Sequence, residues 1–86
     1  MNPHAVILYP LMTERSIYMI ENENKLVFAV KREATKHDVS RAVKTLYGVE
    51  AVSVNTLISR ESIKKAFVKL KPEHDASDLA IRLGIL

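Results

Sequence analysis

The stretch ATKHDVSRAVKTLYGVEAVSVNTL, residues 34–57, predicts a helix that is followed at once by a strand. Its apolar residues recur every three or four positions, as on one face of a helix: Val39, Ala42, Val43, Leu46 and Tyr47. Thr35 stands at the N-cap position, with Asp38 three residues later, so the helix should begin with a capping box. Gly48 follows the last apolar residue and can adopt the left-handed conformation that ends a helix. We therefore expect a helix between Thr35 and Gly48.

The segment that follows predicts a β-hairpin. Residues 49–58 contain three Val, one Thr and one Ile and no Gly or Pro, which favours a strand. Residues 63–70 form a second strand candidate, and only the polar residues 59–62 separate the two. Because the link is so short, the two strands should pair antiparallel.

The remaining elements follow from shorter signals. We expect an edge strand over Ala5–Leu8 ended by Pro10, and a helix from a Thr13 cap to about Glu21. A turn at residues 22–24 then leads into a half-buried strand over residues 25–31. A last helix should be capped by Asp75 and stopped by Gly84.

This order predicts an α/β fold of the α+β kind, in one domain over residues 1–86. The sheet should be small, antiparallel or mixed, with about three helices packed on it, in the order (β)-α-β-α-β-β-α.

The charge is unevenly distributed along the chain. Residues 25–71 contain eleven Lys or Arg against four acidic residues, a net of +7, whereas residues 1–24 and 72–86 each carry −2. The basic face of the predicted helix 35–48, taken alone, is more typical of a solvated surface than of a binding site. Taken with the basic hairpin, however, the pattern indicates a local surface for a polyanion.

The composition argues against catalysis, metal binding and membrane insertion. The three histidines lie more than thirty residues apart, and no cysteine is present to act as a nucleophile, a metal ligand or half of a disulfide. Two glycines are too few for a glycine-rich phosphate loop. No apolar run reaches the 18 residues of a membrane span, and no secretory signal is recognisable. We expect no enzyme, no cofactor, no small-molecule substrate and no membrane insertion.

The second strand of the hairpin carries the clearest candidate surface. Lys65 and Lys69 flank Phe67 on one face. If the partner strand places Ser53 and Asn55 on that face, the result is a basic, partly aromatic surface suited to phosphates and sugars. The chemistry equally allows Phe67 to pack beneath a covering layer, with the lysines extending past it.

Several motifs in order resemble one known family. They are TERS (13–16), NKLVFAV (24–30), ATK (34–36), AVxxLYxV (42–49) and VNTL (54–57). Together they resemble the universal large-subunit ribosomal protein L23 family over nearly the whole chain. The tail from Lys64 to Gly84 is similar to the archaeal branch, because residues 59–62 form only a turn where bacterial members carry a long basic hairpin.

The resemblance implies a cytoplasmic protein of the ribosome that binds large-subunit ribosomal RNA near the nascent-peptide tunnel exit. It also implies neighbouring ribosomal proteins as partners, and a docking platform for nascent-chain factors such as signal recognition particle. Glu14 matches the family's acidic docking position. The residues matched or expected to bind RNA are Arg15, Lys36, Asn55, Thr56, Lys64, Lys65 and Lys69.

A competing hypothesis is a small protein-interaction or dimerisation module that binds no RNA. Its basis is the apolar helical faces and the small net charge of +3. A stable homo-oligomer without affinity for RNA would favour this alternative.

Overall fold

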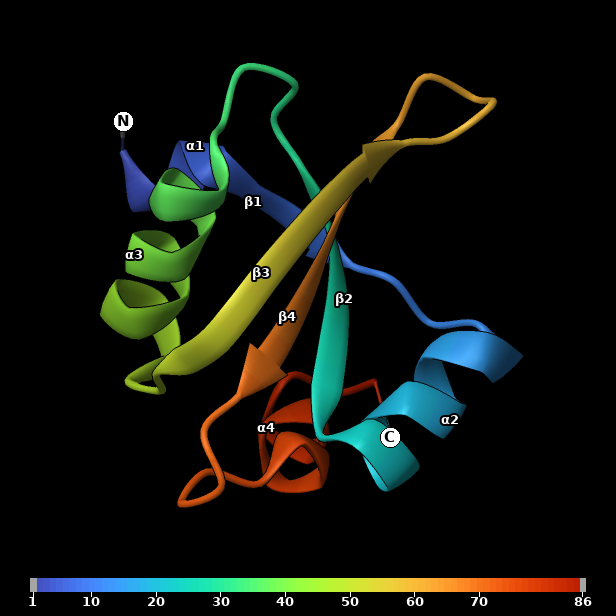
Figure 1. Ribbon diagram of the computed structural model, residues 1–86, viewed down its shortest axis with the longest axis vertical. Helices are drawn as coiled ribbons and strands as arrows, with labels where there is room; N and C mark the ends of the chain where they lie inside the picture. The colour runs from blue at the N-terminus through green and yellow to red at the C-terminus, as the bar shows by residue number, and fades with distance from the viewer. Residues whose placement is uncertain (1, 86) are drawn as a thin grey trace.

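The computed structural model describes residues 2–85 as a four-stranded antiparallel sheet with helices on both sides (Figure 1). The strand order is β1-β2-β4-β3, which confirms the predicted α+β class. The strands are β1 (Ile7–Pro10), β2 (Lys25–Val30), β3 (Ala51–Ile58) and β4 (Lys64–Leu70). The helices are α1 (Pro3–Val6), α2 (Glu14–Glu23), α3 (Lys36–Tyr47) and α4 (Ala76–Arg82).

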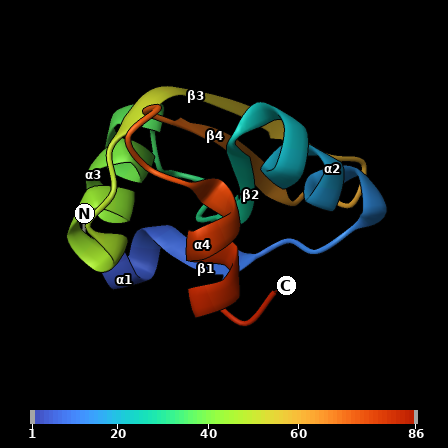
Figure 2. The same cartoon turned by 90° about the horizontal axis from the view of Figure 1, so that it is seen from below.

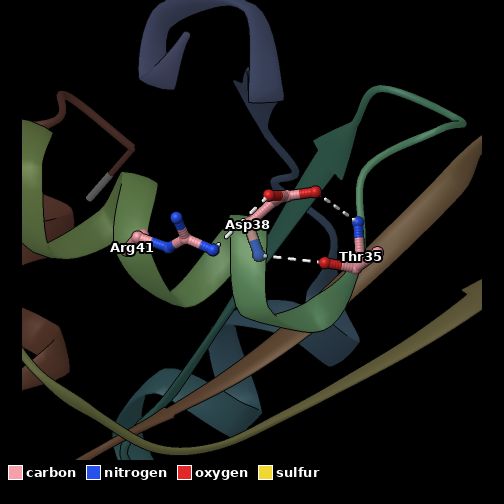
Figure 3. Close-up of polar contacts among 3 residues, drawn as sticks. All are labelled: Thr35, Asp38 and Arg41. Carbon is pink, nitrogen blue, oxygen red and sulfur yellow. Dashed lines mark hydrogen bonds and ion pairs between the residues drawn. The ribbon is translucent and has the colours of Figure 1, made fainter. Parts of the chain in front are cut away.

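Helix α3 begins and ends where the local sequence predicts. The Thr35 hydroxyl accepts a hydrogen bond from the Asp38 N–H at 3.2 Å, and the Asp38 carboxylate accepts one from the Thr35 N–H at 3.0 Å (Figure 3). These bonds from Thr35 lower the pKa of Asp38. Arg41 lies one turn on, 3.9 Å from the Asp38 carboxylate. At the other end Gly48 has a φ of +72°, the left-handed conformation expected of it.

One core lies between α1, α3 and α4 and the inner side of the sheet. Phe28, Leu26 and Val68 are fully buried there. The rings of Phe28 and Tyr47 stack with centroids 5.9 Å apart, which fixes α3 against β2, and burial raises the pKa of Tyr47.

Helix α2 packs on the opposite side of β2 from α3 (Figure 2). For this reason the prediction of a half-buried strand over residues 25–31 was wrong. Val27 and Ala29 are buried as completely as their neighbours. Strand β2 lies inside the sheet and has helices on both faces, so it contains apolar residues in succession.

The N-terminal segment differs from the expected strand over Ala5–Leu8. Asn2 caps a short helix with Pro3 at its first position, and the strand follows only at Ile7. This strand is an edge strand, as predicted, and it ends at Pro10, which faces Phe28. Proline has no backbone N–H. It is tolerated at the first position of a helix, where that N–H would have no intrahelical partner, and on an edge strand, where the sheet can lose one donor. A second small correction is that α2 runs on through Glu23, where a turn was expected.

Candidate nucleic-acid interface

The register of β3 and β4 brings the predicted polar and basic side chains to one side of the hairpin. Ser53 faces Lys69, Asn55 faces Phe67, and Leu57 faces Lys65. Directly opposed residues of an antiparallel pair point to the same side of the sheet. We call this set of six residues the outer face. As the alternation of residues 63–70 suggested, Lys65, Phe67 and Lys69 share this face, and the partner strand adds Ser53 and Asn55.

Helix α2 borders the outer face and forms a hollow with it. The hollow has a volume of about 270 Å³. It is lined by Leu11, Thr13, Arg15, Ser16, Met19, Val27, Leu57, Lys65 and Phe67. Phe67 is half-buried, so α2 covers this ring only in part. Arg15 is therefore near Lys65, although fifty residues separate them in the sequence.

Lys64 lies on the inner side of the sheet, because neighbouring strand residues point to opposite faces. It faces Val30 and Ile58 across the two ladders. Its Nζ donates hydrogen bonds to the carbonyl oxygens of Ala34 at 2.6 Å and Arg32 at 3.3 Å. An ammonium has three N–H groups, so one stays available for a phosphate. Lys64 thus holds the loop that precedes α3.

Lys36 and Thr56 lie nearer to the inner side of the sheet than to the outer face. Lys36 is the first residue of α3 and is exposed. Thr56 faces the buried Ala66 but is itself exposed, because β3 is an edge strand. A second hollow, of about 330 Å³, is lined by both Lys36 and Asn55. It joins the two sides of the sheet around the edge of β3.

The predicted RNA-binding residues therefore fall into two groups. Arg15, Asn55, Lys65 and Lys69 belong to the outer face or its border, and Lys36, Thr56 and Lys64 lie around the β3 edge and the start of α3. The shared hollow at Asn55 connects the two groups into one path over the surface.

Sequence reasoning did not single out three further cations at the same end of the sheet. The loop between β2 and α3 and the turn between β3 and β4 are both at that end, to either side of the sheet's end (Figure 1). We call residues 31–36 and 59–64 the basic end. It holds five Lys or Arg against two Glu, a net of +3. The additional residues are Lys31, Arg32 and Arg60. The Lys31-Arg32 pair directly after a strand was the available signal.

Glu50 reduces the positive charge further along α3. Its carboxylate accepts a hydrogen bond from Lys71 and lies 3.7 Å from Lys44. The hydrogen bond and the charge of Lys71, followed by the charge of Lys44, lower the pKa of Glu50. The carboxylate is therefore ionised at neutral pH and offsets these two lysines.

Glu14, the predicted docking residue, is the first residue of α2 and is exposed. Thr13 and Ser16 form the capping box there: the Thr13 N–H donates to the Ser16 hydroxyl at 2.7 Å, and the Ser16 N–H donates to the Thr13 hydroxyl at 3.1 Å. A negative charge at a helix N-terminus is favourable, so Glu14 also stabilises α2. Its side chain is open to a partner beside the hollow.

Residues 2–85 contain neither a metal-binding group of side chains nor a membrane-spanning helix. Within that range, no three His, Cys, Asp or Glu side chains are grouped as a metal site would require. None of the helices in it is long and apolar enough to cross a membrane.

Comparison with known proteins identifies the family. Residues 5–77 match the model of the family described as ribosomal protein L23. The protein named large ribosomal subunit protein uL23 of Methanococcus aeolicus is 48% identical over 85 residues, which is 99% of either chain. That relative comes from an archaeon, in agreement with the short turn between β3 and β4. With its fold, its family match and its near full-length relative, the chain belongs to the ribosomal protein L23 family, in an archaeal-type form, and so among structural ribosomal proteins rather than enzymes.

Proposed function

We propose that this chain is a structural constituent of the large ribosomal subunit in the cytoplasm and that it binds large-subunit ribosomal RNA near the nascent-peptide tunnel exit. It does so as one RNA-binding domain over residues 1–86. The observation that carries the proposal is the basic path from the outer face around the β3 edge to the basic end. The family to which the chain belongs supports the ribosomal setting.

The residues divide by chemistry into two roles. Cationic side chains neutralise phosphates, and the amide and hydroxyl groups donate to or accept from sugar and phosphate oxygens. The cations are Arg15, Lys36, Lys64, Lys65 and Lys69, and the neutral groups are Asn55 and Thr56. Contacts of this kind hold a protein in place on RNA, and they involve no chemical reaction.

A salt series tests the RNA-binding role. The protein is titrated against an archaeal large-subunit ribosomal RNA transcribed in vitro, and the affinity is measured by filter binding over a range of KCl concentrations. Each neutralised phosphate makes the slope of log affinity against log salt more negative by about 0.7 to 0.9. Contacts by these five cations and by Lys31 and Arg32 of the basic end therefore predict a slope of about −5 to −6. An affinity that does not change with salt, or a stable homodimer without RNA affinity, would contradict the proposal.

The same proposal assigns protein partners to the surface around Glu14. Neighbouring ribosomal proteins at the tunnel exit and signal recognition particle are the partners expected there. Support comes from the exposed carboxylate at the start of α2, which can pair with a cationic group. Because a single exposed ion pair contributes about 1 kcal/mol or less, Glu14→Ala should weaken the binding of signal recognition particle by up to about fivefold. Cosedimentation with reconstituted ribosomes measures this, and Glu21→Ala at the far end of α2 is the control. Equal binding by Glu14→Ala and wild-type ribosomes would remove Glu14 from the docking surface.

A further inference from the structure

We propose that the hollow between α2 and the outer face binds one unpaired RNA base, which stacks on the ring of Phe67 while Arg15 and Lys65 hold its phosphates. This inference rests on the proposed RNA-binding function and deepens it. It adds a contact to the base itself, whereas the path described above contacts only phosphates and sugars.

The lining of the hollow suits a flat aromatic group. Its apolar part is formed by Met19 and Val27, both buried, together with Leu11, Leu57 and Phe67. Phe67 keeps part of its ring accessible. Bases of single-stranded loops and bulges can leave their own stack and pack on an aromatic side chain, whereas paired bases cannot. The volume of about 270 Å³ admits one such group but not a helix.

The charges at the hollow favour a nucleotide over an apolar peptide. Arg15 and Lys65 both line it, and its lining contains no acidic residue. Over residues 2–85, the ion pairs of the structure involve neither of these two cations. An apolar side chain would leave both charges unused, whereas a nucleotide brings a phosphate with its ring. The chemistry therefore points to RNA as the occupant.

Asn55 adds a polar group at the edge of the stacking surface. It faces Phe67 across the β3–β4 ladder and is exposed. Its side-chain amide can donate and accept hydrogen bonds. A base stacked on Phe67 can therefore be contacted at its edge from β3.

The test compares Phe67→Leu with Phe67→Tyr on the same in vitro transcript of archaeal large-subunit ribosomal RNA. Leucine keeps an apolar side chain but removes the aromatic face, so the affinity should fall about tenfold, since stacking of one base on an aromatic ring contributes about 1–3 kcal/mol. The slope of log affinity against log salt should stay the same, because no charge is lost. Phe67→Tyr keeps the ring and should bind within roughly twofold of the wild type.

Ile81→Ala is the matched control, because Ile81 is an exposed apolar residue on α4 that does not line the hollow. Thermal melts check that each variant is folded. Wild-type affinity for Phe67→Leu, or an equal loss for Ile81→Ala, overturns the stacking proposal and leaves the hollow for a protein segment. Such a result would leave the salt-dependent binding of the wild type intact. A wild type that fails to bind RNA overturns the proposed function instead.

Discussion

Replacement of Asn24 by alanine is expected to lower the free energy of unfolding by about 3 kcal/mol, a large share of the roughly 4–13 kcal/mol expected for a domain of this size. The Asn24 side chain joins the end of α2 to the segment between β4 and α4. Its Nδ2 donates to the carbonyl oxygens of Leu70, Lys71 and His74 at 3.3, 3.4 and 3.0 Å. Its Oδ1 accepts from the Ala76 N–H, the first of α4, at 2.8 Å.

The backbone of Asn24 adds to this expected loss. Its φ of 54° and ψ of 38° are left-handed, a conformation that costs alanine about 1–2 kcal/mol. The substitution therefore combines strain with an unsatisfied N–H at the buried Ala76. Urea unfolding followed by circular dichroism measures the change, and the melting temperature should fall by about 15 °C.

Two control variants separate these contributions. Asn24→Gly removes the side-chain hydrogen bonds but tolerates the left-handed backbone, so it should lose about 2 kcal/mol. Asn22→Ala removes only an exposed bond from its Nδ2 to the Tyr18 carbonyl oxygen and should change stability by less than about 0.5 kcal/mol. If Asn24→Gly were as stable as the wild type, the hydrogen bonds of Asn24 would contribute nothing.

Asn24 also illustrates what the sequence could not reveal. Its partners lie 46 to 52 residues away, so no local pattern distinguishes it from Asn22. Helix α3, by contrast, was predictable between Thr35 and Gly48, because its capping box spans only four residues and its stop is a glycine. Local signals fix local structure, and long-range hydrogen bonds become visible only with the fold.

In the candidate site, too, some features follow from local sequence signals and others depend on long-range packing. The outer face followed from the period of two along residues 63–70 and from the short turn before them. The same period puts Lys64 and Lys65 on opposite sides, although the resemblance to the family treats them as one motif. The position of Arg15 beside Lys65 depends on how α2 packs on the sheet, and the sequence does not encode that packing locally.

The largest expected effect on RNA binding follows from the separation of the cations into two groups, one at the outer face and its border and the other at the basic end. Two triple variants each remove three positive charges, one from the outer face and its border and the other from the basic end. The first is Arg15→Gln with Lys65→Gln and Lys69→Gln, and the second is Lys31→Gln with Arg32→Gln and Lys36→Gln. Each should lower the affinity for the ribosomal RNA transcript at 100 mM KCl by about two orders of magnitude. Each should also reduce the salt slope by about two to three.

A third variant with the same change of net charge controls for the loss of long-range attraction. It carries Arg41→Gln, Lys44→Gln and Arg82→Gln, on the exposed sides of α3 and α4. Because long-range attraction between exposed charges is screened within about 10 Å at 0.1 M salt, this variant should reduce the slope by less than about one. Urea unfolding of all three variants checks that the fold is kept. Wild-type affinity in one of the first two variants would restrict the RNA to the other side of the sheet. Wild-type affinity in both would remove the basic path from the interface, because RNA bound across both sides must lose phosphate contacts in either variant.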